Sequence, residues 1–383
     1  MVTLRRVTRD STPEPETASH GPLRAIFLPF LAFGARAFGG PAVQLGELRD
    51  EFIDRRGWTT RERFDRALGV YQLLPGPEAH EMCCYLGTVR GGRLGGIAAG
   101  LGFMLPGLAL MLAASAIYAS IDLRAPAVAC ALMAMQVAAC ALILRAVLRL
   151  LRPLAADWRL MLALGAAIAV LFSRALAPAP HETGTGIASQ APTVAALFGH
   201  GLTAGLVTFG GAYTALPYIT AATAGEGGWM TQRACLDGVA IASVLPAPLV
   251  IFGTFVGYQG GGIAGALAFT AGIFVPAFGF TFLGFGMFER LVSWTPARLA
   301  LDALGAVAVG LIAGAAFEFF YATISTMAGP RAAHQGPLDN QLLPCIGFGV
   351  AMWVLGLLPR RYGAPILVVS AAAVGAAYGA LFG

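Results

Sequence analysis

The sequence contains no lysine, and charged residues of every kind are scarce. All 25 basic residues in the 383-residue chain are arginine, and charged side chains make up 12% of the total. A soluble domain carries about 25% charged residues, so this chain lacks the charge needed to cover a water-exposed surface. Hydrophobic residues account for 57% of the chain. The composition therefore predicts an integral membrane protein.

The motifs of several chemical functions are also missing. The six cysteines have no C-x-x-C spacing, so we expect small buried residues rather than a metal site or a disulfide framework. The sequence has no G-x-x-x-x-G-K-[ST] motif, which argues against direct use of ATP. It also has no flavin, dinucleotide or haem pattern, and no basic stretch interleaved with aromatic residues. We therefore expect no enzyme activity, no cofactor, no metal and no nucleic-acid partner.

Long apolar runs indicate how the chain crosses the membrane. The alternating pattern of a membrane β-barrel is absent, so we expect the spanning elements to be helices. A spanning helix needs about 20 apolar residues. The fold class predicted is thus an all-α polytopic membrane protein. Its predicted membrane segments are 23–44, 64–89, 94–120, 125–151, 159–177, 193–216, 233–258, 262–288, 299–322, 341–359 and 364–382.

The second half of the chain repeats the first. Phe38–Gly40 recurs as Phe209–Gly211, and the offset is 171 positions. The same offset relates Pro75–Pro77 to Pro246–Pro248, in which Ala247 replaces glycine. Glycine and proline inside apolar sequence interrupt helices. The chain is therefore predicted to contain two copies of a broken-helix unit, a pattern typical of transporters whose site lies between the repeats.

The arginine distribution predicts opposite orientations for the two copies. Loop 45–63 contains five arginines, whereas its counterpart 217–232 contains none. Arginine-rich loops stay on the cytoplasmic side, so we expect the two repeats to have inverted topology. If 23–44 and 64–89 are re-entrant hairpins, the arginine-rich loops that follow them lie on the same, cytoplasmic side of the membrane. The alternative is a chain with about nine to eleven full spans. The charged segment Thr60–Arg66 is predicted to mark the start of an interfacial helix, with Thr60 as its cap.

The same patterns divide the chain into four parts. The polar tail 1–22 is expected to be a disordered cytoplasmic segment, because it lacks the hydrophobic run of a signal peptide. The first transporter repeat is predicted at 23–177 and the second at 193–383. The polar stretch 178–192 is the predicted linker between them.

Seven short motifs would each be a weak signal alone, but together they are specific for one protein family. They are Phe38–Pro41, Glu51–Trp58, Gln72–Ala79, Gly95–Gly100 and Leu105–Pro106 in the first half, with Phe209–Tyr213 and Leu245–Pro248 in the second. Together they resemble the chromate ion transporter family, in its long two-domain form. The resemblance covers roughly residues 24–382.

The resemblance implies a proton- or potential-linked exporter that carries chromate out of the bacterial cytoplasm, across the inner membrane. Sulfate, a tetrahedral dianion of similar size, is the implied competitor. The family's second-half motif is often Pro-Gly-Pro, so Ala247 implies a less flexible break in the second copy. The implied partners are the oxyanion and the lipid bilayer, and a homodimer is left open.

The residues themselves also favour an oxyanion site. A helix broken within the membrane exposes unpaired N–H groups and the positive end of its dipole, which attract anions. Arg36 lies inside an apolar segment, where a charge is costly and usually functional, and we expect its guanidinium to clamp two anion oxygens. A structural ion pair, or snorkelling of Arg36 to the interface, is the alternative. The predicted substrate-binding residues are Arg36, Phe38, Gly39, Gly40, Gln44, Gln72, Pro75, Gly76, Pro77, Phe209, Gly210, Gly211, Tyr213, Ser243, Pro246 and Pro248.

Three titratable residues after the first Pro-Gly-Pro motif are candidates for proton coupling. Glu78 beside a bound dianion would hold its proton until the anion leaves. His80 could relay protons near neutral pH, and Glu81 lies within one turn. Alternatively, Glu78 only offsets the helix dipole as an acidic residue in the first turn. Leu249 and Ile251 occupy the equivalent positions, so any proton path is expected in the first half.

Several functions are compatible with these patterns. The leading prediction is a secondary transporter that exports chromate by alternating access. A carrier that takes up or exchanges sulfate or another oxyanion belongs to the same class. An anion channel and a membrane-embedded enzyme, such as a chromate reductase, are less favoured.

Overall fold

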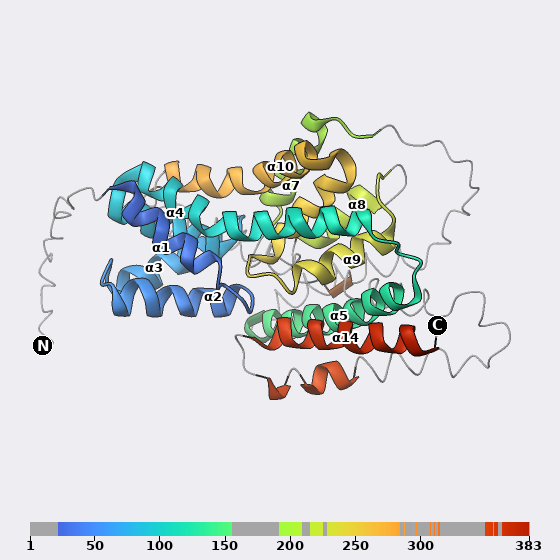
Figure 1. Cartoon of the computed structure of the whole chain (residues 1–383). Coiled ribbons are helices and arrows are strands. Elements are labelled where there is room, and N and C mark those ends of the chain that lie inside the picture. Colours follow the sequence, from blue (N-terminus) through green and yellow to red (C-terminus); the bar gives the residue numbers. More distant parts are fainter. Residues whose placement is uncertain are drawn as a thin grey trace, which may run out of the picture.

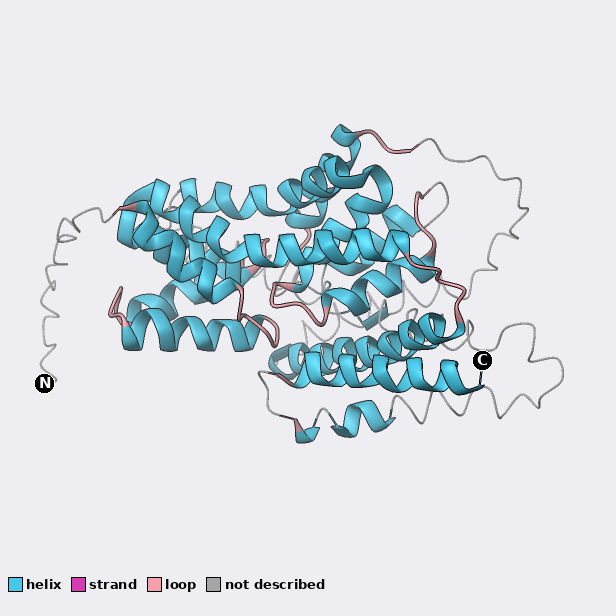
Figure 2. Ribbon diagram, in the orientation of Figure 1, coloured by secondary structure: helices cyan, strands magenta, loops and turns pink. Residues whose placement is uncertain are grey.

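The structure is a computed structural model in which every regular element of the described part is a helix, with no β-strand (Figure 2). The described residues are 22–154, 191–208, 215–224, 228–283, 349–354, 356–358 and 362–382, with a few positions between 287 and 314. The predicted tail 1–22, linker 178–192, and membrane segments 159–177 and 299–322 fall wholly or almost wholly outside these ranges.

The first repeat is a series of short helices followed by a long one. α1 (Leu23–Gly34) precedes α2 (Pro41–Leu48), which continues directly into the π-helix η1 (Arg49–Arg55). α3 (Arg61–Tyr71) and α4 (Glu78–Ser120) come next. The short helices are separated by the glycine- and proline-containing segments that the sequence predicted to be breaks.

The ends of these helices follow from their residues. Pro41 begins α2, where its fixed φ suits the first helical turn. The hydroxyl of Thr60 accepts a hydrogen bond from the backbone N–H of Arg63, which satisfies one of the orphan donors at the start of α3. The predicted N-cap at Thr60 is thus confirmed.

Helix α4 consists of two helices joined by a tight turn at Gly91–Gly92. The second of these glycines has φ +62° and ψ −160°, a conformation that essentially only glycine adopts. Beyond the turn, Gly87 packs against Gly95, and a Cβ on either residue would collide with the carbonyl oxygen of the other. The first arm of α4, residues 78–90, is therefore antiparallel to the second arm, residues 93–120.

The short helices of the first repeat turn back inside the molecule. The Phe30 ring of α1 stacks on Phe52 of η1 with centroids 4.2 Å apart, so η1 returns alongside α1. Ile26, near the start of α1, lies at the Gly91 turn of α4. Figure 1 shows α1, α2 and α3 gathered at one end of the molecule. The α1–η1 pair thus enters and leaves at the same end, as a re-entrant hairpin would.

The second repeat follows the same course. It contains α7 (Val194–Leu206), α8 (Leu216–Ala224), α9 (Gln232–Ala242), the short 3₁₀ helix η3 (Leu249–Ile251) and α10 (Phe252–Leu283). The bounds of α9 are those of α3 shifted by the sequence offset of 171. The repeat in sequence is therefore also a repeat in structure.

Local details agree between the two copies. Thr231 caps α9 as Thr60 caps α3, by accepting a hydrogen bond from the third backbone N–H of its helix. α10 also reverses at a glycine pair, Gly261–Gly262, where the second glycine has φ +59°. Gly257 and Gly265 then face each other across the turn, as their counterparts do in α4.

The second arms of α4 and α10 pass each other in opposite directions. Gly96 lies beside Thr281, and Gly100 lies beside Phe278, so residue numbers rise along one arm as they fall along the other. This antiparallel crossing is what a pair of inverted repeats produces.

A further pair of helices, α5 (Pro126–Leu154) and α14 (Gly363–Phe382), packs side by side (Figure 1). Gly375 of α14 lies on the backbone carbonyl of Cys130 in α5, where a side chain would not fit. Small residues allow backbones to approach in this way in membrane helices, where packing drives association.

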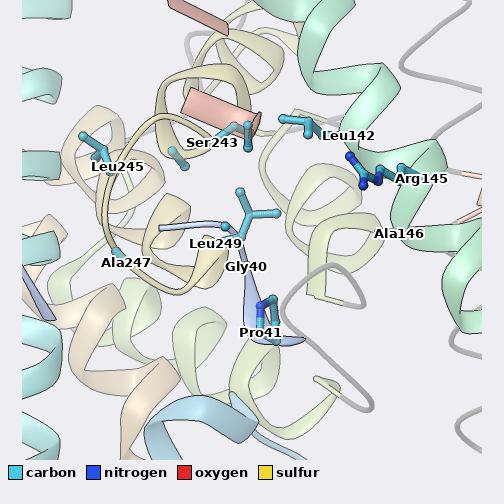
Figure 3. A pocket seen from close by; sticks show the side chains of 12 residues that line it. Gly40, Pro41, Leu142, Arg145, Ala146, Ser243, Leu245, Ala247 and Leu249 are labelled. Atoms are coloured by element: carbon cyan, nitrogen blue, oxygen red, sulfur yellow. The ribbon is translucent and has the colours of Figure 1, made fainter. Parts of the chain in front are cut away.

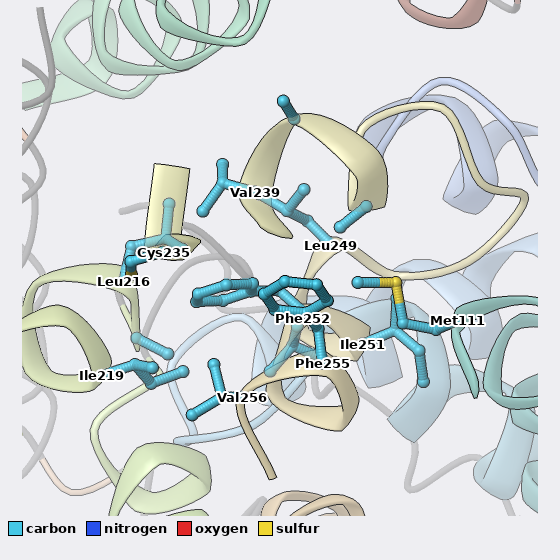
Figure 4. Close-up of a cluster of buried hydrophobic side chains, with 14 of the residues drawn as sticks. Met111, Leu216, Ile219, Cys235, Val239, Leu249, Ile251, Phe252, Phe255 and Val256 are labelled. Carbon is cyan, nitrogen blue, oxygen red and sulfur yellow. The ribbon is translucent and has the colours of Figure 1, made fainter. Parts of the chain in front are cut away.

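The buried core is apolar and rich in aromatic rings. One cluster in the first repeat contains Phe30 and Phe52, both fully buried. A larger cluster joins α9, η3 and α10 to Met111 of α4, with Phe252 and Phe255 among its members (Figure 4). Replacing such a buried phenylalanine with alanine costs about 3–5 kcal/mol. The second arm of α4 therefore packs into the core of the other repeat.

Among the described residues, four helical stretches are long and apolar enough to cross a membrane: Glu78–Ser120, Pro126–Leu148, Leu249–Leu283 and Gly363–Leu381. Their exposed surface carries apolar side chains such as Ile263, which is 64% exposed. Such a surface suits contact with lipid rather than water. The fold is that of an all-α polytopic membrane protein.

Candidate functional site

Four breaks separate the short helices, and the backbone groups at their edges lack partners within a helix. We call them break A (35–40), break B (72–77), break C (207–215) and break D (243–248). Residues 209–214 of break C lie outside the described residues. The predicted ligands that fall there are Phe209, Gly210, Gly211 and Tyr213.

Breaks B and C meet across the two repeats, and we call their contact the B–C junction. The backbone N–H of Gly76 donates a 2.7 Å hydrogen bond to the carbonyl oxygen of Thr208. The Thr208 hydroxyl donates to the carbonyl oxygen of Ala204, one turn back in α7. Pro75 and Pro77 flank the bonded glycine, and neither can continue a helix through it.

Breaks A and D line a cavity, and we call this region the A–D junction. The cavity has a volume of about 80 Å³ and lies between Gly39–Pro41 and the chain around Ser243 and Ala247 (Figure 3). Gly39 and Gly40 have φ of +94° and +80°, values that favour glycine. A water molecule needs about 10–15 Å³ on this scale, so the cavity has room for a few waters or one small anion.

The backbone at the A–D junction has donors to offer. The N–H groups of Gly39 and Gly40 donate to no backbone carbonyl in the described part of the chain. They lie just before the start of α2, at the positive end of its dipole. Pro246 and Pro248 bracket Ala247 on the opposite side and are buried. The junction therefore combines backbone donors with a wall of small residues.

The A–D cavity also contains a cation that the sequence did not single out as a ligand. Arg145 of α5 lines the cavity, and its guanidinium nitrogens lie on the side that faces Gly40 and Leu249 (Figure 3). None of the described residues lining the cavity is acidic. A signal was present, because Arg145 falls within the apolar span Pro126–Leu148, where a charge is usually functional.

Arg36 lies outside this cavity. Its side chain is exposed, and its Nε donates a 2.9 Å hydrogen bond to the carbonyl oxygen of Ala32. It lines a separate cavity of about 120 Å³, which also contains the carboxylates of Glu47, Asp50 and Glu51. Whether Arg36 clamps the substrate is not tested by this placement and stays a prediction.

Two other predicted ligands hold or adjoin break A. The Gln44 side chain is fully buried, and its Nε2 donates a 2.8 Å hydrogen bond to the carbonyl oxygen of Ala37, which fixes break A against α2. The Phe38 ring lies 6.1 Å from that of Tyr362, at the start of α14. Both residues therefore shape the break beside the cavity.

The remaining neutral candidates differ in their positions. Ser243 lines the A–D cavity, and its hydroxyl donates to the carbonyl oxygen of Val239 in α9. Gln72 is exposed at the C-terminal end of α3. The structure thus brings Ser243 together with the break A glycines, and it places Gln72 apart from them.

Three buried titratable side chains follow break B. Glu78 is 7% exposed, and His80 and Glu81 are fully buried. Glu81 lies against Gly76, and neither of its carboxyl oxygens has a hydrogen-bond partner among the described residues. The His80 ring packs on Phe274 of α10, with centroids 4.7 Å apart. The predicted proton-coupling residues are thus gathered behind the B–C junction.

Sequence reasoning passed over one buried acid, Asp237 of α9, which is 1% exposed. Its carboxylate accepts a 2.8 Å hydrogen bond from the Tyr118 hydroxyl and a 2.7 Å hydrogen bond from the Gln136 amide. Tyr118 belongs to α4 and Gln136 to α5, so Asp237 ties three helices together. Its position inside the predicted membrane segment 233–258 was the available signal.

Long apolar helices, two similar copies of one structural unit whose long arms run antiparallel, and paired helix breaks between the copies are typical of a multi-pass membrane protein of the transporter class. Within the described ranges, no group of three or more histidine, cysteine or acidic side chains is arranged to hold a metal ion. The chain belongs to the chromate transporter family, which it matches over residues 24–188 and 195–377.

The chain is similar in sequence to several chromate transport proteins. The chain is 40% identical to a chromate transport protein of Pseudomonas aeruginosa over 338 residues, which cover 78% of this chain and 81% of that protein. It is 27% identical to a chromate transport protein of Cupriavidus metallidurans over 334 residues, with 78% and 83% covered. A probable chromate transport protein of Synechococcus elongatus is 24% identical over 387 aligned positions, with 90% and 93% covered. No solved structure matches the chain.

Proposed function

We propose that the protein is a secondary transporter that exports chromate, or a tetrahedral oxyanion of the same charge and shape, across the bacterial inner membrane. The named relatives are chromate transport proteins. The observation that carries the proposal for this chain is the A–D cavity, which is bounded by helix breaks of both repeats and has an arginine but no acid in its described lining.

The chemistry of the breaks suits an oxyanion. Gly39 and Gly40 let the backbone approach a ligand without a side chain in the way, and N–H groups at a helix start attract negative charge. Ser243 adds a hydroxyl from the other repeat. We assign the remaining predicted ligands, Phe38, Gln44, Gln72, Pro75, Gly76, Pro77, Pro246 and Pro248, to shaping the breaks, with Arg36 a candidate ligand beside its own cavity.

Transport would proceed by alternating access. Each junction pairs the first break of one repeat with the second break of the other, so the junctions are counterparts. A rocking movement of one repeat against the other would therefore open one junction as the other closes. Loss of the Gly76–Thr208 hydrogen bond would accompany one of these states.

The membrane potential would favour export over uptake. With the cytoplasm negative, the exit of an anion gains about 2.3 kcal/mol per charge for each 100 mV, and a dianion gains roughly twice that. Proton coupling would come from Glu78, His80 and Glu81. Burying an ionised carboxyl without a partner is costly, so the gain or loss of a proton at Glu81 would change the stability of the B–C junction.

Transport by the purified protein in liposomes tests this function, with pH and membrane potential set independently. We expect saturable chromate flux that responds to the gradients and is inhibited by sulfate. Absence of both chromate and sulfate flux under every gradient would refute the proposal. Labelled sulfate measured in parallel, in both vesicle orientations, separates export of chromate from uptake or exchange of sulfate.

Two other classes give different results in the same vesicles. A channel would pass the anion without saturation and without response to a proton gradient. An enzyme such as a chromate reductase would change the oxidation state of the chromium, which absorbance of the recovered chromate reveals.

A further inference from the structure

We propose that Asp237 is a proton-binding residue at the outer end of the protein, in addition to the acids behind the B–C junction. This inference rests on the proposed function, because it names a group that would exchange the coupling proton with the outer solution. Asp237 belongs to α9, and Arg66 occupies the equivalent position in the first repeat. The site is therefore not part of the repeated motifs and exists in one copy.

The partners of Asp237 can serve both of its protonation states. One carboxylate oxygen accepts a hydrogen bond from the Tyr118 hydroxyl, and the other accepts one from the side-chain amide of Gln136. A hydroxyl and a side-chain amide each combine a donor with an acceptor. A protonated Asp237 could therefore donate its O–H to one partner and still accept from the other. An arginine in their place could only donate, and it would hold the carboxylate in its ionised form.

The described side chains around Asp237 are mostly apolar. Arg233, one turn earlier on α9, is the charged group among the described residues that acts on the Asp237 carboxyl, and it is exposed. α10 presents the fully buried Phe255 ring to this part of α9. On α8, the titratable residue is Tyr218, whose hydroxyl is hydrogen-bonded to the ring of His200. A proton gained or lost at Asp237 thus changes the charge of a buried region, where such a change has a large effect.

The length of α4 places Asp237 near one surface of the membrane. Its partner Tyr118 lies 26 positions after Gly92, or about 39 Å along a helix at 1.5 Å per residue. The hydrocarbon layer is about 30 Å thick, so the glycine turn and Tyr118 lie toward opposite faces. Arg90 and Arg93 flank the turn, which marks its side as cytoplasmic. Asp237 would therefore exchange protons with the outer solution, through the largely exposed loop that follows α4.

Protonation of Asp237 would loosen the contact between three helices. Tyr118 belongs to α4 of the first repeat, Gln136 to α5, and Asp237 to α9 of the second repeat. Hydrogen bonds to an ionised group are roughly twice as strong as those between neutral groups, so the three helices are held most tightly when Asp237 is ionised. A proton taken from the outer solution would weaken the contact and favour opening on that side, where the exported anion leaves.

The experiment measures chromate and sulfate flux by the full-length protein in vesicles of one orientation, with the pH of each side set separately at a fixed potential. Flux through the parent should rise as the outer pH falls. Asp237→Asn keeps the shape and the hydrogen-bonding capacity of the side chain but cannot titrate, so it should lose this dependence. Asp122→Asn, at an exposed acid in the loop after α4, is the matched control and should behave as the parent does.

A second variant guards against misfolding of Asp237→Asn and separates proton binding from a structural role. Tyr118→Phe removes one donor to the ionised carboxylate, so the outer pH of half-maximal flux should rise by about one unit. The dependence of flux on the inner pH should stay that of the parent. A merely structural contact would lower the melting temperature of Tyr118→Phe without moving the outer midpoint, which would overturn the inference.

Infrared difference spectra give a readout that does not depend on transport. Acidification should produce a carbonyl band of a protonated carboxyl in the parent that Asp237→Asn lacks, and identical spectra would overturn the inference. If the parent transports the anion and Asp237→Asn keeps the full dependence on outer pH, only this inference fails. If the parent transports neither chromate nor sulfate, the proposed function fails, and the infrared band still decides whether Asp237 binds a proton.

Discussion

The B–C and A–D junctions have the same backbone plan and opposite side-chain chemistry. At the B–C junction, Gly76 and Thr208 are joined by a direct backbone hydrogen bond, and Glu78 and Glu81 are buried behind it. At the A–D junction, a cavity separates the breaks, and Arg145 lines it. The duplicated scaffold therefore carries acids at one junction and a cation at the other.

This difference indicates a division of labour under the proposed function. Leu249 and Ile251 occupy the positions that Glu78 and His80 hold in the first copy, so the second copy has no counterpart of the buried acid group. A dianion would be repelled by ionised carboxyls and drawn to the arginine. Under the proposed function, proton handling at one junction and anion binding at the other would follow from sequence divergence on a shared framework.

The largest effect is expected from removing the buried acid of the B–C junction. In Glu81→Gln, chromate flux should no longer respond to a proton gradient, and the gradient-driven rate should fall about tenfold or more, because the group that exchanges the proton is gone. Flux into liposomes at fixed potential and varied pH measures this. Glu62→Gln, on the exposed face of α3, is the control.

The Glu78→Gln variant, measured in the same assay, tests which of the two buried acids couples transport to the proton gradient. Loss of the pH response in Glu78→Gln alone would move the coupling role to Glu78. A full pH response in both variants would contradict the proposed role of the B–C junction.

A smaller effect is expected where α4 touches break D at the A–D junction. A Cβ added at Gly107 would collide with the Cβ of Ala247. Gly107→Ala should therefore lower the free energy of unfolding by about 1–3 kcal/mol, the usual range for overpacking. The double variant with Ala247→Gly should recover most of the loss, since the colliding atom is removed. Thermal unfolding in detergent measures both, and a double variant as unstable as the single one would refute the contact.

The hairpin turns test how alike the two repeats are. Gly92 and Gly262 both have positive φ, and no atom lies within 4 Å of a Cβ added at either position. Gly92→Ala and Gly262→Ala should each cost about 1–3 kcal/mol of stability through backbone strain, and the two values should agree. Gly69→Ala, in the open middle of α3, should instead stabilise slightly, because alanine has the higher helix propensity. A large difference between the two turns would show that the copies have diverged in their hairpins.

The smallest effect concerns the arginine-rich segment 45–63, whose counterpart in the second repeat contains no arginine. Glu51 lies outside the membrane-spanning helices, and the 2.9 Å hydrogen bond from Arg56 lowers the pKa of its carboxyl. A lowered native-state pKa stabilises the protein above the unfolded pKa of about 4.3, and this gain is lost as pH falls through the native value.

Glu51→Gln should therefore reduce stability at pH 7 by at most about 1 kcal/mol, as for other surface ion pairs. At about pH 3, the variant and the parent should unfold at similar temperatures. Melting temperatures recorded from pH 7 to pH 3 measure the difference. A gap that stays constant over this range would mean that Glu51 acts through packing rather than charge.

Much of the scaffold could be predicted because its signals are local. The offset of 171 positions predicted α9 from α3, and Thr60 and Thr231 cap these helices as their sequence positions indicate. Glycine and proline in apolar runs predicted the breaks, because their effect on a helix does not depend on distant residues. The helix at the start of the predicted membrane segment 64–89 begins three residues earlier, at Arg61, because the Thr60 cap sets its start.

The side chains that gather at each junction could not be predicted in the same way. Arg145 is about a hundred positions from break D along the chain, and the packing of α5 on α9 brings them together. In the sequence, Arg145 looks like one more basic residue near the end of a span. Arg36 drew attention because it adjoins the glycine motif, yet its side chain leaves break A and lies among carboxylates. Adjacency along the chain does not fix the direction of a long, flexible side chain.

The hydrogen bond between Gly76 and Thr208 has a consequence for how such a chain can evolve. Each half supplies only one partner of every junction, so neither half is complete without its twin. A substitution in one break would be accommodated most directly by a change in the other copy, far away in the linear order, rather than by its immediate neighbours. Halves that are joined in this way can specialise, but they cannot drift independently.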